Sequence, residues 1–101
     1  WQEGIPMPNG ERVHVMEADL YHLIVDGRIA RKPERIEFVL HHVYEIREAR
    51  DGRRRILSRW QEDGEDRYAF GILAGDRLWT VHLIETHDLR KYRNENVLWR
   101  P

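Results

Sequence analysis

The sequence predicts an α+β fold in which one or two N-terminal helices pack on a four-stranded antiparallel β-meander. Two β-rich runs meet at Gly75-Asp76, a glycine-first pair that suits a tight type II′ turn. Two further runs with strand composition flank Asp51-Gly52, another strong hairpin signal. Before them, the apolar residues that follow Pro33 recur at helical spacing. These observations place helices first and an antiparallel sheet afterwards.

All 101 residues are expected to form a single domain, since this length supports one modest core. Within it we expect an extended lead-in over residues 1–11, a helix-plus-meander core over 17–92 and a tail over 93–101. The tail has an apolar tip, for which a closing strand, a short helix and a partner-binding segment all stay open. Because the chain starts at Trp1, a tag remnant, a processed end and a piece of a larger protein stay open as well.

The composition, 41% hydrophobic and without cysteine, is typical of a soluble globular protein and excludes a disulfide framework. No apolar run reaches the ~20 residues that cross a bilayer, and no signal-peptide pattern occurs. We therefore expect a cytoplasmic protein with no membrane partner, with a secreted effector domain as the alternative. Although the net charge is −1, arginine supplies nearly all the positive charge, and guanidinium groups suit phosphate recognition. A solvated arginine-rich surface is the competing interpretation.

Two segments before the meander favour helices. Over residues 17–25, apolar side chains fall near one helical face and Gly27 follows as a C-terminal cap; an extended conformation of this run is the alternative. The second helix is expected to begin at Pro33, a residue favoured in the first turn, and to end near His42. Residues 43–55 allow either a continued helix or a hairpin, and we favour the hairpin.

The register of the meander decides which side chains share a face. A three-residue loop at residues 62–64 directs Ile56 and Ser58 to the core. The same loop directs Arg59 to the face of His82, and a loop of even length would reverse both faces.

The last hairpin is expected to place its large apolar residues on the core face. A two-residue turn at Gly75-Asp76 predicts these core-face pairs: Ile72–Trp79, Phe70–Val81 and Tyr68–Leu83. The other face then pairs Gly71 with Thr80 and Ala69 with His82. Small residues beside a histidine and a hydroxyl leave a shallow polar depression, which is the predicted working surface.

The predicted catalytic residues are His82, His22, Arg59 and Thr80. A histidine near a hydroxyl and an arginine is what cleavage of RNA through its 2′-OH needs. One group takes the 2′ proton, one protonates the leaving oxygen, and the guanidinium stabilises the phosphorane. The competing interpretations are a half-buried sheet histidine satisfied by a neighbour for His82 and a packed helical histidine for His22.

The predicted substrate-binding residues are Arg53, Arg54, Arg55 and His87. The three arginines follow the hairpin turn and form the densest basic run, which suits an RNA-backbone clamp or a solubilising strand edge. We expect no metal site and no cofactor. The HExxH pattern is absent, no recognisable ligand set accompanies the histidines, and no glycine-rich phosphate loop occurs.

The order of elements resembles the RelE-like and barnase/EndoU-type small ribonucleases, whose compact members place helices before a four-stranded antiparallel sheet. The stretches that carry the resemblance are DLYHLIVDGRI, KPERIEFVLHHVYEI, RRRILSRW, YAFGILAGDRLWTVHLIET and HDLRKY. The resemblance implies metal-independent RNA cleavage, often by the toxin of a toxin–antitoxin pair. By position, His22 matches the histidine of that family's leading helix, and Arg59 a basic strand residue. Thr80 or His82 matches polar residues of the late strands. The scarcity of lysine departs from the basic character of many such nucleases.

The alternative function is a non-catalytic protein-interaction module, such as an antitoxin, an immunity protein or an inhibitor. Mixed charge and exposed aromatic side chains, expected at Trp1, Trp60 and Trp99, suit a protein interface. The expected partners are therefore RNA, a cognate antitoxin or another protein, and a second copy of the chain through an edge strand at residues 12–16.

Overall fold

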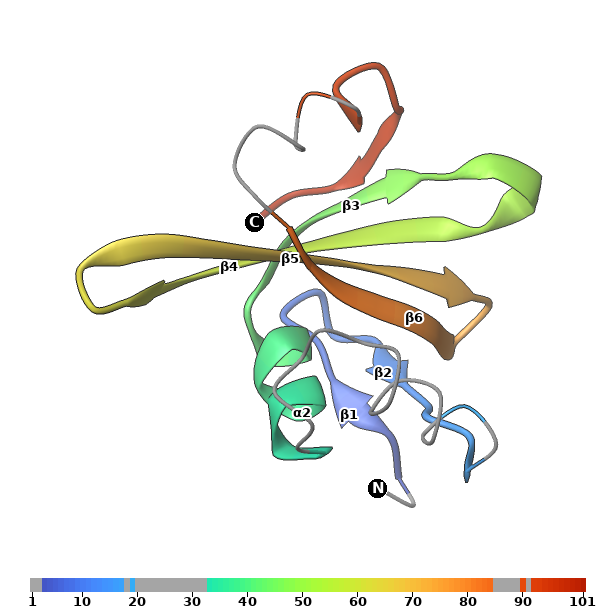
Figure 1. The fold of residues 1–101 in the computed structure, drawn as a ribbon. Helices are drawn as coiled ribbons and strands as arrows, with labels where there is room; N and C mark the ends of the chain where they lie inside the picture. Colours follow the sequence, from blue (N-terminus) through green and yellow to red (C-terminus); the bar gives the residue numbers. More distant parts are fainter. Residues whose placement is uncertain (1–2, 18, 20–32, 85–89, 91) are drawn as a thin grey trace.

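The computed structural model describes residues 3–17, 19, 33–84, 90 and 92–101, with the backbone alone described at residues 33 and 82–84. In this part of the chain the fold is mostly β, with a five-stranded antiparallel sheet, a two-stranded sheet and one short helix (Figure 1). The predicted fold class, one or two N-terminal helices on a four-stranded meander, is therefore wrong, although the antiparallel β-rich character is confirmed. Both the lead-in and the tail contribute strands, although their short and irregular sequences do not predict them.

The elements of the described residues have the following bounds: β1 Ile5–Pro6, β2 Arg12–Val13, α2 Pro33–His41, β3 Val43–Glu48, the 3-10 turn η1 Arg50–Gly52, β4 Arg54–Glu62, β5 Glu65–Ala74, β6 Arg77–Ile84 and β7 Val97–Trp99. The large sheet has the order β6-β5-β4-β3-β7, so four consecutive strands form a meander and β7 is added beside β3. No helix in these ranges is long and apolar enough to cross a membrane.

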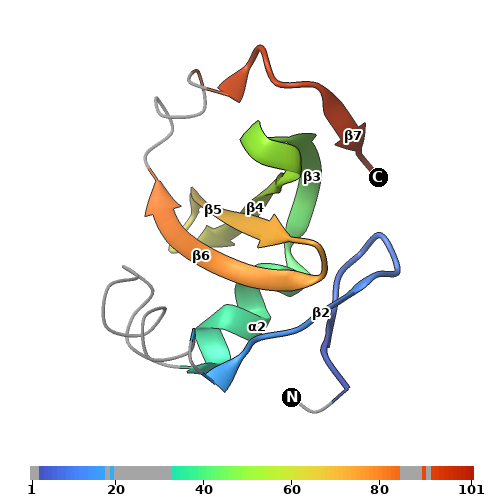
Figure 2. The ribbon, with the colours of Figure 1, turned by 90° about the vertical axis from the view of Figure 1, so that its right-hand side faces the viewer.

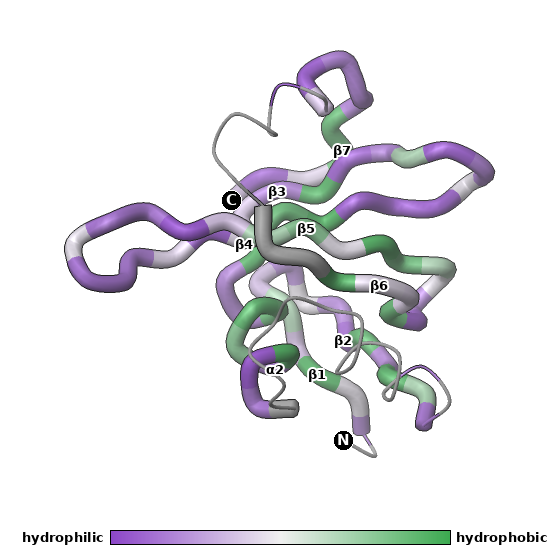
Figure 3. Tube along the Cα trace, viewed as in Figure 1, coloured by the Kyte–Doolittle hydropathy of each residue, from purple (hydrophilic) through white to green (hydrophobic). Residues whose placement is uncertain are grey.

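The hydrophobic core lies between one face of the large sheet and a layer made of α2 and the β1–β2 hairpin (Figures 1 and 2). The C-terminal segment, residues 92–101, contains β7 and lies on the side of the sheet away from α2 (Figure 2). The buried core residues are Ile5, Met7, Val13, Ile36, Val39, Leu40, Val43, Ile46, Ile56, Trp60, Ala69, Leu73, Leu78 and Val81. The lead-in is thus part of the core, whereas hydrophilic residues gather at the projecting β3–β4 and β4–β5 turns (Figure 3).

The N-terminal hairpin is attached to the edge of the sheet at β6. The backbone N–H of His14 donates to the Asp76 carbonyl at 2.7 Å, and that of Leu78 donates to the His14 carbonyl at 2.9 Å. Arg77 also forms a two-pronged ion pair with the buried Asp19 carboxylate, at 2.5 and 2.8 Å. Of the edge strand predicted at residues 12–16, only residues 12–13 form a strand, paired with β1.

The helix α2 begins at Pro33 as predicted and ends at His41, one residue before the predicted end. Ser58, only 1% exposed, donates its hydroxyl to the Val39 carbonyl at 2.7 Å, which ties the last turn of the helix to β4. The helix predicted over residues 17–25 lies, except for residues 17 and 19, outside the described residues.

The hairpin predicted at Asp51-Gly52 is confirmed, and the alternative of a continued helix is not observed. Asp51 and Gly52 both have positive φ, 61° and 72°, a conformation that glycine and aspartate tolerate better than most residues. The Ala49 N–H closes the turn by donating to the Arg53 carbonyl at 2.9 Å.

The β4–β5 loop is shorter than predicted. Glu62 pairs directly with Glu65, so the loop consists of Asp63 and Gly64 alone, with φ of 54° and 77°. Two positive φ values define the type I′ turn, whose twist matches that of the flanking strands. The prediction of a three-residue loop is therefore wrong.

The β5–β6 hairpin contains a β-bulge that changes its register. Ala74 pairs with Arg77 as predicted, but Trp79 is then an extra residue. The pairs that follow are Ile72–Thr80, Gly71–Val81 and Phe70–His82, so the predicted pairs beyond the turn are wrong. The core face of β5 instead carries the buried Ala69, Gly71 and Leu73.

The close packing around Gly71 explains why this face of β5 is the core face. A Cβ atom there would lie 2.9 Å from the Thr80 carbonyl oxygen and 3.1 Å from Cγ1 of Ile56. This position on the core face therefore has no room for a large side chain, and Phe70 and Ile72 take the outer face.

The β4–β5 loop is one residue shorter than predicted, and the core face of β5 is the opposite of the predicted one. These two errors compensate each other, so the predicted faces of β4 are correct. Ile56 and Ser58 are buried on the core face, as predicted. Arg59 lies opposite Tyr68 on the outer face, the face to which the register also assigns the His82 position.

Candidate ligand-binding groove on the outer face of the sheet

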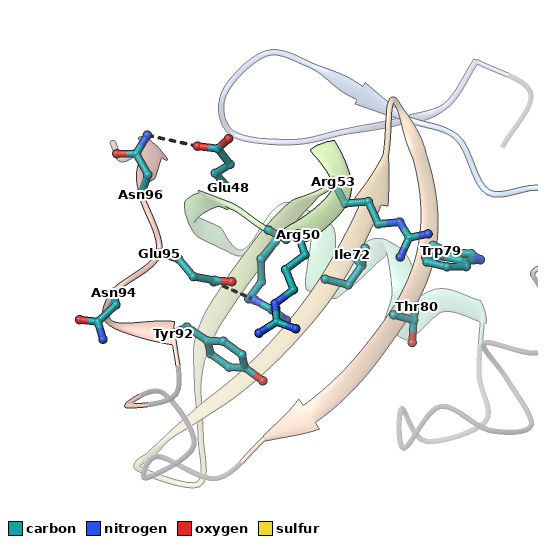
Figure 4. A pocket seen from close by; sticks show the side chains of 12 residues that line it. Glu48, Arg50, Arg53, Ile72, Trp79, Thr80, Tyr92, Asn94, Glu95 and Asn96 are labelled. Atoms are coloured by element: carbon teal, nitrogen blue, oxygen red, sulfur yellow. Dashed lines mark hydrogen bonds and ion pairs between the residues drawn. The ribbon is translucent and has the colours of Figure 1, made fainter.

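A groove of about 750 Å³ lies on the face of the sheet that is turned away from α2 (Figure 4). Its floor is a row of side chains across three strands, because Arg55 pairs with Ile72 and Ile72 with Thr80. One wall is the β3–β4 turn and the other is the C-terminal segment. The residues that line it are Glu48, Ala49, Arg50, Arg53, Arg55, Ile72, Trp79, Thr80, Tyr92, Asn94, Glu95 and Asn96.

The first feature of the groove is a stack of Arg53 on Trp79. The guanidinium carbon of Arg53 lies 3.8 Å from the centre of the indole ring (Figure 4). Trp79 is 39% exposed, since the bulge removes it from the regular alternation that buries Leu78 and Val81. A guanidinium at this distance from an aromatic face is held by cation–π attraction, and both groups remain accessible from the groove.

The second feature is Arg55, which is held by two aromatic rings and one carboxylate. Its guanidinium carbon lies 4.0 Å from the centre of the Tyr92 ring and 5.3 Å from that of Phe70. Its Nε donates to Oε1 of Glu95 at 2.9 Å. The side chains of Arg55 and Glu95 are 16% and 21% exposed, so the ion pair is only partly screened by water.

The wall that carries Tyr92 and Glu95 is fastened to the sheet at three places. The guanidinium of Arg47 donates to the Tyr92 carbonyl. The Glu48 N–H donates to the Asn96 carbonyl at 2.8 Å. Further along, β7 pairs with β3.

Below this wall, the buried Glu45 joins two arginines. Its carboxylate accepts from Arg47 at 3.1 Å and from Arg100 at 2.7 Å. Glu45 is only 3% exposed, and these arginines balance its charge. Its carboxylate therefore does not belong to the groove.

Among the lining residues that the structure describes, the arginines (Arg50, Arg53 and Arg55) outnumber the glutamates (Glu48 and Glu95) by three to two. Arg50 and Arg53 form no ion pair with any other described residue. Several arginines elsewhere form ion pairs with carboxylates, namely Arg35, Arg47, Arg54, Arg67, Arg77 and Arg100. Although the whole chain has a net charge of −1, the groove therefore presents a local excess of cationic groups to an incoming ligand.

Three of the residues predicted from the sequence meet in this groove, namely Arg53, Arg55 and Thr80. Arg54 does not, because it belongs to the opposite face of β4. It donates to the Glu11 carboxylate at 2.7 Å and to the Gly75 carbonyl at 2.9 Å. The prediction that Arg54 binds substrate together with its neighbours is therefore not supported by its position.

Arg59 lies outside the groove. Its guanidinium carbon is 4.9 Å from the centre of the Tyr44 ring, and it lines a separate pocket of about 470 Å³ with Trp60, Gln61 and Asp66. His82 is described only by its backbone in β6, opposite Phe70, while His22 and His87 lie outside the described residues. The catalytic role predicted for these histidines stays a prediction.

Trp79, Tyr92 and Glu95 are among the lining residues that the sequence did not predict. Trp79 is expected in the core, and a bulge exposes it instead. Tyr92 and Glu95 belong to the C-terminal segment, where no periodic pattern indicates that they return to the sheet. Conversely, Trp60 is expected to be exposed but is buried at 6% exposure, with its ring edge-to-face on Phe38.

Within the described ranges, no three side chains among histidines, aspartates and glutamates are placed to hold a metal ion. The arrangement is instead suited to an anionic ligand with flat rings. Comparison with protein-family models, with curated proteins and with solved structures finds no match to this chain.

Proposed function

We propose that this domain binds single-stranded RNA in the groove. The observation that carries the proposal is the pair of guanidinium–aromatic stacks, Arg53 on Trp79 and Arg55 on Tyr92, which line one groove. Arg50 lines the same groove and forms no ion pair with any other residue that the structure describes. Such an arrangement offers phosphate-binding cations and base-stacking surfaces next to each other.

Each part of a nucleotide finds a complementary group there. Arginine forks bind phosphate oxygens, and unstacked bases pack on aromatic rings or on guanidinium planes. Thr80, Asn94 and Asn96 add hydroxyl and amide groups of the kind that bind ribose and base edges. A single strand is favoured over a duplex because only unpaired bases expose their faces for stacking. RNA as the ligand agrees with the cytoplasmic setting that we expect for the chain.

Cleavage of the bound RNA is a separate step that needs a proton acceptor and a proton donor. Thr80 lines the groove, and His82 lies two residues further along β6. No histidine is among the described residues that line the groove. We therefore rest the proposal on binding and keep metal-independent transesterification by His82 as its extension.

Binding is tested by fluorescence anisotropy of a labelled single-stranded oligoribonucleotide at several salt concentrations. Arg53→Ala should weaken binding and lower the slope of log Kd against log salt by about 1. Arg54→Ala is the matched control, since it removes the adjacent arginine on the opposite face. Equal losses in the two variants would overturn the proposed site, because they would report total charge and not the groove.

The same RNA, incubated with the protein in EDTA, tests the extension. Cleavage by the wild type that is lost in a folded His82→Ala/His22→Ala variant would establish a metal-independent ribonuclease. Binding without cleavage would leave a non-catalytic RNA-binding domain. Absence of binding would overturn the RNA proposal and favour the alternative, a protein-interaction module whose Trp79 and arginines contact an acidic protein partner.

A further inference from the structure

We infer that the Glu95 carboxylate occupies the phosphate-binding position of Arg55, so that an RNA phosphate must displace it to bind there. The inference rests on the proposed function and adds a built-in competitor to it. It makes Glu95 a residue that weakens binding of the ligand, although it lines the groove.

The geometry of Arg55 supports the exchange. The Tyr92 and Phe70 rings fix the plane of the guanidinium, with the Tyr92 ring centre 4.0 Å from its central carbon. The Nε–H donor that faces the groove wall is already used by Oε1 of Glu95 at 2.9 Å. Carboxylate and phosphate oxygens take the same position on a guanidinium edge, so one excludes the other there.

Glu95 can leave this position without unfolding the wall. Its own N–H donates to the Tyr92 carbonyl at 3.1 Å, and the neighbouring Asn96 carbonyl accepts from the Glu48 N–H at 2.8 Å. These bonds hold the backbone on both sides of the side chain. Rotation of the carboxylate toward water therefore breaks a single ion pair and leaves Tyr92 on Arg55.

The other carboxylates near the wall differ from Glu95 in this respect. Glu45 is buried and accepts from two arginines, so its release would leave its own carboxylate and the mostly buried Arg47 without a partner. The Glu48 carboxylate accepts a hydrogen bond from the Asn96 amide at 3.5 Å and forms no ion pair with an arginine among the described residues. Glu95 alone among the three pairs with a guanidinium that lines the groove.

The test compares Glu95→Gln with Glu48→Gln, since each variant removes one negative charge from the groove. With the labelled oligoribonucleotide, Glu95→Gln should bind about threefold to fivefold more tightly than the wild type, the size expected when a partly exposed ion pair no longer competes. Glu48→Gln removes a carboxylate that pairs with no described arginine, so it should tighten binding by less than Glu95→Gln does. In the Arg55→Ala background, Glu95→Gln should bring no further gain. Circular dichroism and urea unfolding confirm that all variants are folded.

Three results would overturn the inference. If the wild type binds RNA and Glu95→Gln binds it equally well or less tightly, Glu95 does not compete with the ligand, and the proposed function remains intact. An equal gain in Glu95→Gln and Glu48→Gln would assign the effect to net charge. Absence of RNA binding in the wild type and in Glu95→Gln would reject the proposed function itself, and the inference with it.

Discussion

Arg53 and Trp79 meet across two hairpins, with the guanidinium carbon of Arg53 at 3.8 Å from the centre of the Trp79 ring. Arg53 belongs to the β3–β4 turn and Trp79 is the extra residue of the β-bulge in β6. Two irregular features of the meander thus create one wall of the groove. Either feature alone would leave an isolated surface side chain.

The stack should contribute measurably to stability as well as to binding. In a double-mutant cycle of Arg53→Ala and Trp79→Ala, urea unfolding should give a coupling of about 0.5–1 kcal/mol, the value typical of exposed cation–π pairs. Additive single effects would show that the two side chains are neighbours without an energetic contact. In RNA titrations, Trp79→Ala should weaken binding by roughly 1–3 kcal/mol, as loss of a base-stacking ring does.

Gly71 should be intolerant of any side chain. Gly71→Ala forces a Cβ to within 2.9 Å of the Thr80 carbonyl oxygen, and we expect a loss of about 1–3 kcal/mol in the free energy of unfolding. Gly52 is the informative comparison, because its φ is +72° and a Cβ added there would meet no atom within 4 Å beyond its chain neighbours. There the strain is conformational, so Gly52→Asn should be milder than Gly52→Ala, whereas Gly71→Asn should be worse than Gly71→Ala. The opposite order at Gly71 would contradict the packing argument.

Glu45 should be essential for attaching the C-terminal segment. Glu45→Ala leaves Arg47, whose side chain is 13% exposed, without its carboxylate, and breaking a buried ion pair in this way costs about 3–5 kcal/mol. The measurement is urea unfolding followed by tryptophan fluorescence. The exposed pair between Arg35 and Glu62, at 3.4 Å, is the control, and Arg35→Ala should cost less than about 1 kcal/mol of ion-pair energy. A similar small loss for Glu45→Ala would show that the buried charges are not coupled.

The contact between Glu11 and Arg54 should make the free energy of unfolding depend on pH in the acid range. The hydrogen bond from Arg54 lowers the pKa of Glu11 below its ordinary value of 4.5. A lowered pKa in the folded state stabilises the fold above that ordinary value, and the benefit is lost as the pH falls through the folded-state pKa. The stability advantage of the wild type over Glu11→Gln should therefore be full near neutral pH and fade below about pH 4.5. In an Arg54→Met background this pH dependence should shrink, since only the weaker hydrogen bond from Asn9 still lowers the pKa of Glu11; an undiminished pH dependence would contradict the role of Arg54.

Local signals in the sequence predict the elements better than their register. Pro33 marks the start of α2 and Asp51-Gly52 marks a hairpin, because a fixed φ and a positive φ are properties of single residues. The bulge at Trp79 and the two-residue loop at residues 63–64 depend on packing across strands. A shift of one residue exchanges the two faces of a strand, so the predicted faces of β5 are reversed.

The candidate site is predicted in part for the same reason. Arg55 and Thr80 belong to strands and Arg53 directly precedes β4, and the sequence identifies all three. Arg54 alternates to the opposite face and binds Glu11. Glu95 reaches the groove through long-range contacts, the pairing of β7 with β3 among them, which a strand of three residues does not reveal in the sequence.

The most direct test of RNA binding in the groove is a two-dimensional ¹⁵N correlation spectrum recorded during titration with a short single-stranded oligoribonucleotide. We predict that the indole N–H of Trp79 and the backbone amides of Arg50, Arg53 and Thr80 shift with a single binding curve. The indole N–H of Trp60, buried against α2, should not move. Shifts confined to surfaces outside the groove, or no shifts at saturating RNA, would contradict RNA binding in the groove.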